Sequence, residues 1–421
     1  MREDIKKRIE AVRRGEVPEE YHRTKDIGIA PVDWRVGQLS DVLHNETRPV
    51  PKPNEPYWRL GIRSWAKGTF HAYVDDPKTV DMDELYIVRE NDLVVNITFA
   101  WEHAIAVASK EDDGLLVSHR FPTYVFDGGN VPEYYKAVVS QRFFKDMLEH
   151  ISPGGAGRNR VLNRKDFLTV PCYIPPVAEQ QKIADILATC DRVIELKQQL
   201  LEEKRRQKQW LMQKLLSESS AFNEMPLSNL CSTICDGDWI ESKDQSESGI
   251  RLIQTGNVGV GRYLDKEGRA RYISEDTFKK LNCTEVFAGD ILLSRLPDPI
   301  GRAGMVPNLS TRAITAVDCT ILRFKDADVA EFFLQYATSN EYFNKISILA
   351  GGSTRTRISR KEIEKLLIPV PTSKTAMQKI SKGLSLADQE ISSLEQELEA
   401  WQQKKKALMQ LLLTGLVRVN A

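Results

Sequence analysis

Two stretches of this sequence, 197 residues apart, decide how the chain folds. They read QKIADILATCDRVIELKQQLLEEKRRQKQWLMQKLL (181–216) and QKISKGLSLADQEISSLEQELEAWQQKKKALMQLLL (378–413). Without a gap, Ile183 aligns with Ile380, Asp191 aligns with Asp388, and both copies contain LMQ near their ends. Upstream, GGAGRNRVLNRKDF (154–167) matches GGSTRTRISRKEI (351–363). So many identities in register indicate a duplicated unit of roughly 190–200 residues.

Both stretches have the apolar spacing of a long helix that packs against another helix. Apolar residues recur at seven-residue steps, as coiled coils require. Three lysines (Lys197, Lys204 and Lys208) stand in the first copy where a strict seam would be apolar. Because neither helix buries its stripe alone, we expect the two copies to pack together; the alternative is that each lies on its own globular domain. The predicted seam residues are Leu187, Ile194, Leu201, Leu211, Leu384, Ile391, Leu394, Leu398, Trp401 and Leu408.

The regions that precede the helices have mixed α and β character. DLVVNITF (92–99) and DILLSRL (290–296) resemble strands, whereas PEYYKAVVSQRFF (132–144) and AEFFLQYATSNEYF (330–343) resemble helices. We therefore predict an α+β fold in which two similar lobes alternate with two helical repeats. The predicted boundaries are an N-terminal helical extension at 1–31, lobes at 32–157 and 223–354, and repeat helices at 158–222 and 355–421.

The charges are distributed unevenly along the chain. The 59 Lys and Arg balance 59 Asp and Glu over all 421 residues. Residues 46–157 carry 12 basic against 17 acidic residues, while 158–217 and 355–421 each carry 12 basic against 7 acidic residues. The zero net charge therefore does not exclude a nucleic-acid partner, because basic clusters follow the Gly-Gly loop at each lobe–helix junction.

Searches for catalytic motifs give no candidate residue. There is no G-x-x-x-x-G-K-[ST] loop, no G-x-G-x-x-G turn and no G-x-S-x-G elbow. The segment nearest to an amino-methyltransferase loop is Asn54-Glu55-Pro56-Tyr57, in which Glu55 replaces a required proline. The six cysteines lack C-x-x-C spacing, so we expect reduced thiols and no metal site. No apolar run reaches the length of a membrane span.

Three segments resemble the framework of the specificity subunit of type I restriction–modification systems. They are TKDIGIAPVDWRVGQLSDV (24–42), IPPVAEQQKIADIL (174–187) and LMQLLLTGLVRV (408–419). VPTSKTAMQKI (370–380) departs from the pattern, because it lacks the Pro-Pro-x-x-Glu-Gln form of the first copy. The resemblance implies two target recognition domains, each reading half of a bipartite DNA sequence. It also implies that the helices form an antiparallel coiled coil that sets the spacing of the halves, with an internal pseudo-twofold repeat.

The resemblance further implies the partners of the chain. Double-stranded DNA, two modification (methyltransferase) subunits and restriction (translocase–endonuclease) subunits would bind it in the cytoplasm. S-adenosylmethionine, ATP and Mg would belong to those partners, so the chain itself would be a non-catalytic recognition subunit without a cofactor. Two alternatives stay open at this point: a stand-alone DNA-modifying enzyme, and a coiled-coil scaffold that does not bind DNA.

Base recognition requires forked hydrogen-bond donors on loops. In both lobes we expect them near matching strands, and we expect the junction arginines to contact phosphates. The predicted DNA-binding residues of the first lobe and its junction are Arg59, Arg63, Lys67, Asn96, Thr98, Trp101, Arg158 and Arg160. Those of the second lobe and its junction are Arg251, Gln254, Asn257, Arg295, Arg302, Arg355 and Arg357.

Overall fold

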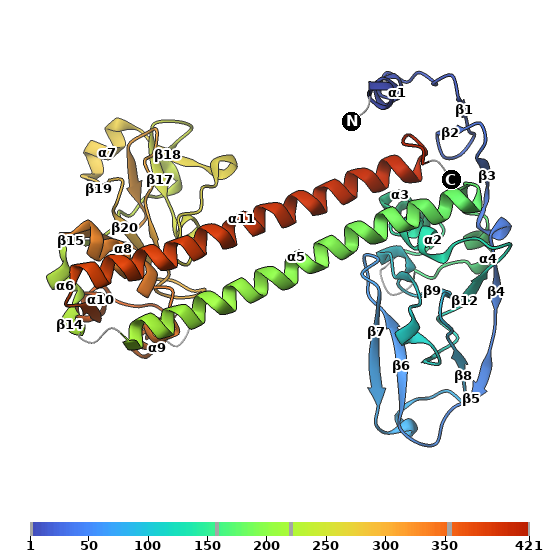
Figure 1. Ribbon diagram of the computed structural model, residues 1–421, viewed down its shortest axis with the longest axis horizontal. Helices are drawn as coiled ribbons and strands as arrows, with labels where there is room; N and C mark the ends of the chain where they lie inside the picture. Colours follow the sequence, from blue (N-terminus) through green and yellow to red (C-terminus); the bar gives the residue numbers. More distant parts are fainter. Residues whose placement is uncertain (1–2, 156–159, 219–221, 352–355, 420–421) are drawn as a thin grey trace. The chain divides into compact units, whose positions relative to one another are not determined.

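The chain forms two compact units (Figure 1). In this computed structural model, residues 3–155, 160–218, 222–351 and 356–419 are described. Unit 1 comprises residues 1–196 together with 398–421, and unit 2 comprises residues 197–397. Each unit therefore combines one lobe with a segment of each of two long helices, α5 (Val177–Glu218) and α11 (Lys374–Leu413). The helices begin 197 residues apart, which is the period of the sequence repeat.

Unit 1 contains the first lobe and the N-terminal segment. Its helices are α1 (Glu3–Arg13), α2 (Pro132–Val139), α3 (Arg142–His150) and α4 (Arg164–Leu168). Its strands are β1 (Tyr21–Arg23), β2 (Ile29–Pro31), β3 (Arg35–Gln38), β4 (Leu43–Glu46), β5 (Pro49–Pro51), β6 (Tyr57–Ile62), β7 (Thr69–Val74), β8 (Glu84–Ile87), β9 (Leu93–Val95), β10 (Ile105–Val107), β11 (Leu116–Val117), β12 (Thr123–Phe126) and β13 (Pro171–Ile174).

Unit 2 contains the second lobe. Its shorter helices are α6 (Leu227–Leu230), α7 (Glu275–Leu281), α8 (Ala327–Tyr336), α9 (Asn340–Leu349) and α10 (Arg360–Lys365). Its strands are β14 (Phe222–Pro226), β15 (Cys231–Asp236), β16 (Gln245–Ser246), β17 (Ile250–Ile253), β18 (Arg271–Ile273), β19 (Glu285–Val286), β20 (Ile291–Ser294), β21 (Ala303–Met305), β22 (Ala313–Thr315), β23 (Cys319–Phe324) and β24 (Leu367–Pro371).

The two lobes share one sheet framework. A four-stranded antiparallel sheet has the order β10-β9-β12-β4 in unit 1 and β15-β23-β20-β21 in unit 2. A five-stranded sheet has the order β5-β8-β11-β6-β7 in unit 1 and β16-β18-β17-β22-β19 in unit 2. Each five-stranded sheet contains one parallel pair, β11 with β6 or β22 with β17. The edge strands β5 and β16 have no counterpart in the other lobe, so the frame is conserved between the lobes and the edges vary.

Each lobe is joined to its helices by a hydrophobic core. In unit 1, buried Tyr134, Phe144 and Phe167 lie in one cluster with residues of α5 and α11. In unit 2, buried Phe333, Tyr342 and Ile363 lie in the corresponding cluster. The α5 and α11 residues of these clusters are Ile183, Leu187, Leu408 and Leu412 in unit 1 and Leu211, Leu215, Ile380 and Leu384 in unit 2. In unit 1 the N-terminal part of α5 thus packs with the C-terminal part of α11. In unit 2 the C-terminal part of α5 packs with the N-terminal part of α11, so the helices are antiparallel.

The two helices pair reciprocally. In unit 2, Lys208 of α5 lies 2.6 Å from Asp388 of α11. In unit 1, Lys405 of α11 forms an ion pair with Asp191 of α5. Residue 405 stands at the repeat position of residue 208, and residue 388 stands at that of residue 191. The same two repeat positions therefore meet in both units, with the lysine on α5 in unit 2 and on α11 in unit 1. This is the contact pattern of a self-complementary twofold interface.

The lysines that interrupt the predicted apolar seam are paired with acidic residues. Lys197 Nζ lies 2.5 Å from a carboxylate oxygen of Glu397, and Lys204 Nζ lies 2.7 Å from one of Glu390. Together with the Lys208 pair, these contacts replace part of the apolar seam by cross-helix ion pairs. Partly exposed pairs of this kind each contribute about 0.2–1 kcal/mol, and they also select the helix register.

A buried carboxylate joins distant parts of unit 1. Glu179, at the start of α5, is 2 % exposed and accepts hydrogen bonds from Trp34 Nε1 at 2.8 Å and from the Arg418 guanidinium at 2.9 Å. Arg418 also binds Asp33 at 2.8 and 2.6 Å. Nearby, Gly415 has a left-handed φ of 68°, and a Cβ there would lie 2.5 Å from Pro31. The C-terminal segment is therefore fixed on the segment that precedes the first lobe.

The predicted fold class is confirmed: two mixed lobes accompany two long antiparallel helices built from an internal repeat. One detail differs, because the predicted helix at 132–144 is two helices, α2 and α3, which are separated at Ser140 and Gln141. The second lobe breaks at the equivalent place, where Ser339 caps α9 by accepting a hydrogen bond from the Tyr342 amide. The domain boundaries drawn from the sequence remain predictions. Of the N-terminal extension, α1 is helical and residues 21–31 form the β1–β2 hairpin.

Candidate nucleic-acid interface

The loops after β9 and β20 occupy the same place in the two lobes. Each strand is preceded by a residue with positive φ, Asn91 at 69° or Gly289 at 90°. The next residue is a buried aspartate, Asp92 or Asp290, whose carboxylate accepts a backbone N–H three residues back at 2.8 Å. These turns fix where each strand starts, so the loops that follow are presented from equivalent positions in both lobes.

In the first lobe, the loop after β9 presents two of its three predicted DNA-binding residues. Asn96 is 9 % exposed, and its side-chain oxygen accepts the Thr98 amide at 3.1 Å, so its carbonyl shapes the turn. Thr98 and Trp101 are half-buried. The Trp101 indole N–H donates to the Thr98 carbonyl at 3.2 Å, which orients the ring within the loop.

A chain of contacts connects this loop to neighbouring aromatic and basic side chains. Arg160 lies 5.4 Å from the Trp101 ring centroid and 3.5 Å from Glu149, and Lys145 lies 3.9 Å from Glu149. The Lys145 ammonium in turn lies 4.9 Å from the Trp65 ring centroid. We call this the aromatic–basic surface; it consists of Trp65, Thr98, Trp101, Arg120, Lys145, Glu149 and Arg160, with Arg120 reaching Thr98 Oγ1 at 3.4 Å.

The predicted DNA-binding residues of the β6–β7 hairpin are close in sequence to Trp65, a member of this surface. Arg59 is half-buried within β6. Arg63 and Lys67 are exposed in the connecting turn, where Arg63 stacks 5.3 Å from the Phe70 centroid and donates to the Thr69 carbonyl. The turn therefore carries exposed cations, which are suited to phosphate contact.

In the second lobe, two predicted residues at β17 and its following turn are buried. Arg251 is 7 % exposed, lies 3.4 Å from Asp265 and stacks on Tyr272. Asn257 is 6 % exposed; its amide donates to the Leu264 carbonyl at 2.9 Å, and its oxygen accepts the Gln254 backbone N–H at 3.0 Å. Gln254 is half-buried. Arg251 and Asn257 thus have internal partners that stabilise the fold.

The loop after β20 is also held by its arginines. Arg295 is 8 % exposed and lies 2.5 Å from Asp236. Arg302 donates to the carbonyls of Val258, Thr255 and Pro299 at 2.7, 3.0 and 3.0 Å, and burial lowers the pKa of its guanidinium. Both arginines therefore position loops, and any DNA contact by them remains a prediction.

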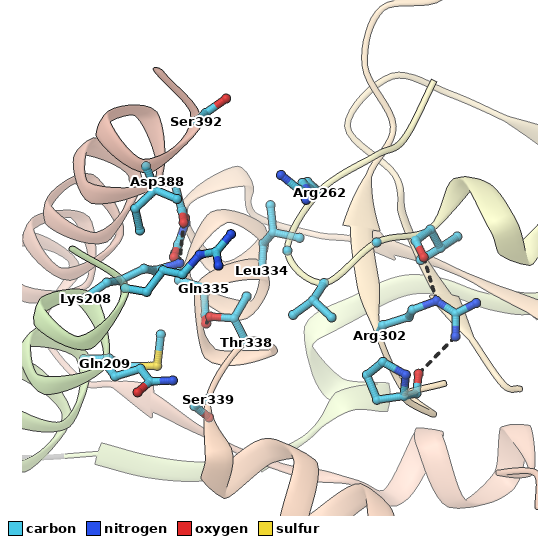
Figure 2. Close-up of a pocket in the computed structure, with 18 of the residues that line it drawn as sticks. Lys208, Gln209, Arg262, Arg302, Leu334, Gln335, Thr338, Ser339, Asp388 and Ser392 are labelled. Atoms are coloured by element: carbon cyan, nitrogen blue, oxygen red, sulfur yellow. Dashed lines mark hydrogen bonds and ion pairs between the residues drawn. The ribbon is translucent and has the colours of Figure 1, made fainter. Parts of the chain in front are cut away.

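A groove of about 1200 Å³ lies in unit 2 between the second lobe and its helix segments. Figure 2 shows Lys208 and Asp388 on one wall, and Arg262 and Arg302 on the other. Arg262 lies 3.1 Å from Glu395 of α11, which also pairs with Arg205 at 2.7 Å. Burial raises the pKa of Glu395, but these two arginines outweigh it and the net shift is downward. The charges of the groove largely neutralise one another, which does not favour a strongly anionic ligand.

The structure describes two of the four junction arginines, Arg160 and Arg357. Arg160 donates to the Ser152 and Glu149 carbonyls at 3.1 and 2.9 Å. Arg357 is exposed and lies 3.0 Å from Asp318. Arg158 and Arg355 lie outside the described residues. Phosphate contact by all four stays a prediction.

Sequence reasoning missed four members of the aromatic–basic surface: Trp65, Arg120, Lys145 and Glu149. Trp65 stands in WRLGIRSWAKG between the predicted Arg63 and Lys67, so a tryptophan between two cations was the available signal. Arg120 and Lys145 lie in segments without a comparable pattern, and only the fold brings them close to Thr98 and Trp65.

The described residues offer little for metal or thiol chemistry. Among them, no group of three or more His, Cys, Asp or Glu side chains is placed to hold a metal ion. All six cysteines are free thiols, and burial raises the pKa of Cys172 and Cys231 to about 12, which disfavours the reactive thiolate. No helix in the described part of the chain is both long enough and apolar enough to cross a bilayer.

Comparisons with known proteins agree with this architecture. The family described as "Type I restriction modification DNA specificity domain" matches residues 31–204 and 222–400. The putative type I restriction enzyme MjaX specificity subunit of Methanocaldococcus jannaschii is 24 % identical over 429 residues, covering 96 % of this chain and 98 % of the relative.

Two solved structures have a similar fold. A chain from structural work on complex assembly and conformational transition of the type I R-M system has a TM-score of 0.60 at 16 % identity, covering 92 % of this chain and 99 % of that one. The type I restriction-modification S subunit from M. genitalium has a TM-score of 0.54 at 14 % identity, covering 90 % and 96 %.

Proposed function

This chain belongs to the family of type I restriction modification DNA specificity domains, and from that premise we propose that it is the specificity subunit of such a system. Each lobe reads one half of a bipartite DNA target. The antiparallel helices set the number of unread base pairs between the halves, because half-site spacing follows the spacing of the reading elements.

One observation carries the proposal: two lobes with one framework present different side chains from equivalent loops. The loop after β9 presents Thr98 and Trp101, whereas the loop after β20 contains Arg295 and Arg302. A repeated frame with divergent loops suits two related tasks on different sequences. A scaffold that never contacts DNA has no need for this divergence.

The partners follow from the role. We propose that two modification subunits and the restriction subunits assemble on the chain in the cytoplasm and supply S-adenosylmethionine, ATP and Mg chemistry. The chain itself contributes recognition and no bond-making step.

A methyl-transfer assay tests the proposal. The purified chain, the modification subunit and their mixture are each incubated with double-stranded DNA and labelled S-adenosylmethionine. We expect sequence-specific transfer only from the mixture. Transfer by the chain alone would make it an enzyme, and a mixture that methylates without sequence preference would support the scaffold alternative.

A further inference from the structure

Trp65 has an unusual backbone and an exposed side chain. It lies in the turn between β6 and β7 with a φ of 65°, and the next residue, Ala66, has a φ of 49°. Two consecutive non-glycine residues in the left-handed region are uncommon, and a bulky side chain is rare there. Trp65 is nevertheless 60 % exposed, so burial of the residue does not compensate for this conformation.

Hydrogen bonds to the neighbouring loop hold the turn in this conformation. The Trp65 amide donates to the Glu102 carbonyl at 2.8 Å, and the Ala66 amide donates to the His103 carbonyl at 2.8 Å. The Ser64 hydroxyl adds a bond to the Glu102 carboxylate at 2.6 Å. His103 is itself buried, and its Nε2 lies 2.6 Å from the Val139 carbonyl. The turn is thus fastened to the interior of the lobe, and strain that persists in this way is typical of functional sites.

The surroundings of Trp65 are cationic and contain a second indole. Lys145 lies 4.9 Å from its ring centroid, and Arg63 and Lys67 flank it in the same turn. Through Glu149 and Arg160, the surface continues to Trp101. Glu102 and Glu149 are engaged by Ser64, Lys145 and Arg160. An exposed aromatic ring among cations is the composition with which proteins bind nucleic acid through backbone and base contacts together.

We propose that Trp65 stacks on the face of a nucleobase in the half-site read by the first lobe, at a base step that opens in the complex. This inference rests on the proposed function. An indole offers one N–H donor and a broad π face, so its distinctive contribution to DNA binding is stacking. In an intact duplex both base faces are covered by neighbours, so stacking requires a kinked or unstacked step. The hydrogen bonds of the turn hold the backbone of Trp65 in place, which lowers the entropy cost of ordering this residue on binding.

The test uses the full chain assembled with its modification partner and duplex DNA that carries its mapped target. 2-Aminopurine, whose fluorescence rises on unstacking and is quenched by stacking, replaces adenines of the first half-site one at a time. We expect one position to respond on binding, and Trp65→Ala to change that response. Replacing a base-stacking aromatic by alanine weakens binding by about 5- to 150-fold, whereas Trp65→Phe should retain most of the affinity.

Trp58 provides a matched control on the same hairpin. It is 52 % exposed and stacks on Tyr73 with a centroid distance of 4.9 Å, but it lies within regular β6 and outside the aromatic–basic surface. Trp58→Ala should leave affinity within about twofold and the 2-aminopurine signal unchanged. The salt dependence of binding should be the same for Trp65→Ala and the unaltered chain, because the indole contacts no phosphate.

Three results would overturn the inference. The first is unchanged affinity and fluorescence in Trp65→Ala, and the second is an equal loss in Trp58→Ala. The third is a Trp65→Ala chain that assembles poorly with the modification subunit while the complexes that do form bind target normally, which would assign Trp65 to a protein interface. If the unaltered complex shows no target preference at all, the proposed function fails, and that outcome is distinct from the other three.

Discussion

Replacing Glu179 by glutamine should strongly destabilise unit 1. Four donors converge on the two carboxylate oxygens: Trp34 Nε1, Arg418 Nε, Arg418 Nη2 and the Val419 amide. A carboxamide has one oxygen, so in either orientation its NH2 group faces a donor. The side chain of Glu179 is 3 % exposed, and water therefore cannot replace the missing acceptor.

The magnitude follows from the partners that remain. Breaking a buried ion pair by removing one charge costs about 3–5 kcal/mol. Arg418 keeps Asp33, which is exposed and binds it at 2.6 Å, so the lower end of this range, about 3 kcal/mol, is expected. For a unit of about 150–250 residues, each kcal/mol lowers the melting temperature by about 2–4 °C, which gives a decrease of roughly 6–12 °C.

Hydrogen exchange measured on peptides of each unit, together with calorimetric melting, checks this prediction. Exchange should accelerate in peptides around residues 31–38 and 410–419, while unit 2 should be unaffected because Ala376 stands at the repeat position of Glu179. Asp33→Asn is the matched control. It should lower the free energy of unfolding by less than about 1 kcal/mol, because Arg418 still pairs with Glu179 in this variant. A melting shift of Glu179→Gln below about 1 °C would refute the reasoning.

Two further predictions concern ionisable groups. Reversing the charge of Lys208 or Asp388 alone should destabilise unit 2, and a double-mutant cycle that reverses both should give a coupling energy of about 0.5–2 kcal/mol. The equivalent cycle for Lys405 and Asp191 should give a similar value, and a coupling energy near zero in both cycles would contradict reciprocal pairing. Burial lowers the pKa of His103, so below about pH 6.5 the unfolded chain binds more protons than the folded chain, and the free energy of unfolding falls with falling pH. His103→Gln should weaken this pH dependence in urea unfolding measured between about pH 7.5 and 5.5, and an unchanged dependence would refute the prediction.

The helical repeat could be predicted because its information is local and duplicated. The starts of α5 and α11, at Val177 and Lys374, follow the sequence period, and each lies shortly after a proline. All ten predicted seam residues are buried or half-buried. The partners of the seam lysines could not be predicted, since the apolar pattern of one helix does not reveal which acidic residues of an antiparallel neighbour will face it.

The candidate interface was harder to predict, for a physical reason. Arginine and asparagine bind DNA bases and also satisfy buried backbone groups, and the sequence does not distinguish these uses. Asn257 and Arg295 have internal partners of the second kind, namely backbone carbonyls and Asp236, and their contact with DNA stays a prediction. Trp65 was missed because its significance lies in a left-handed φ and in hydrogen bonds to Glu102 and His103, which depend on the folded loop.

The even balance of charge also has a structural explanation. Many of the basic residues of the helices are paired with acidic residues of the partner helix, as at Lys197 and Lys204. The exposed cations of the β6–β7 turn, Arg63 and Lys67, lie in a lobe that is acidic as a whole. We therefore expect the isolated chain to bind DNA weakly, and the assembled complex to bind it far more tightly.

Mapping methylated bases across a host genome tests the central claim most directly. The modification subunit is expressed with this chain, without it, and with a chain whose first lobe (32–157) is exchanged for that of another specificity subunit. We predict methylation of one bipartite sequence only when a specificity chain is present, and a change confined to one half of that sequence after the exchange. Methylation that is independent of the chain, or an exchange that alters both halves or neither, would contradict the account.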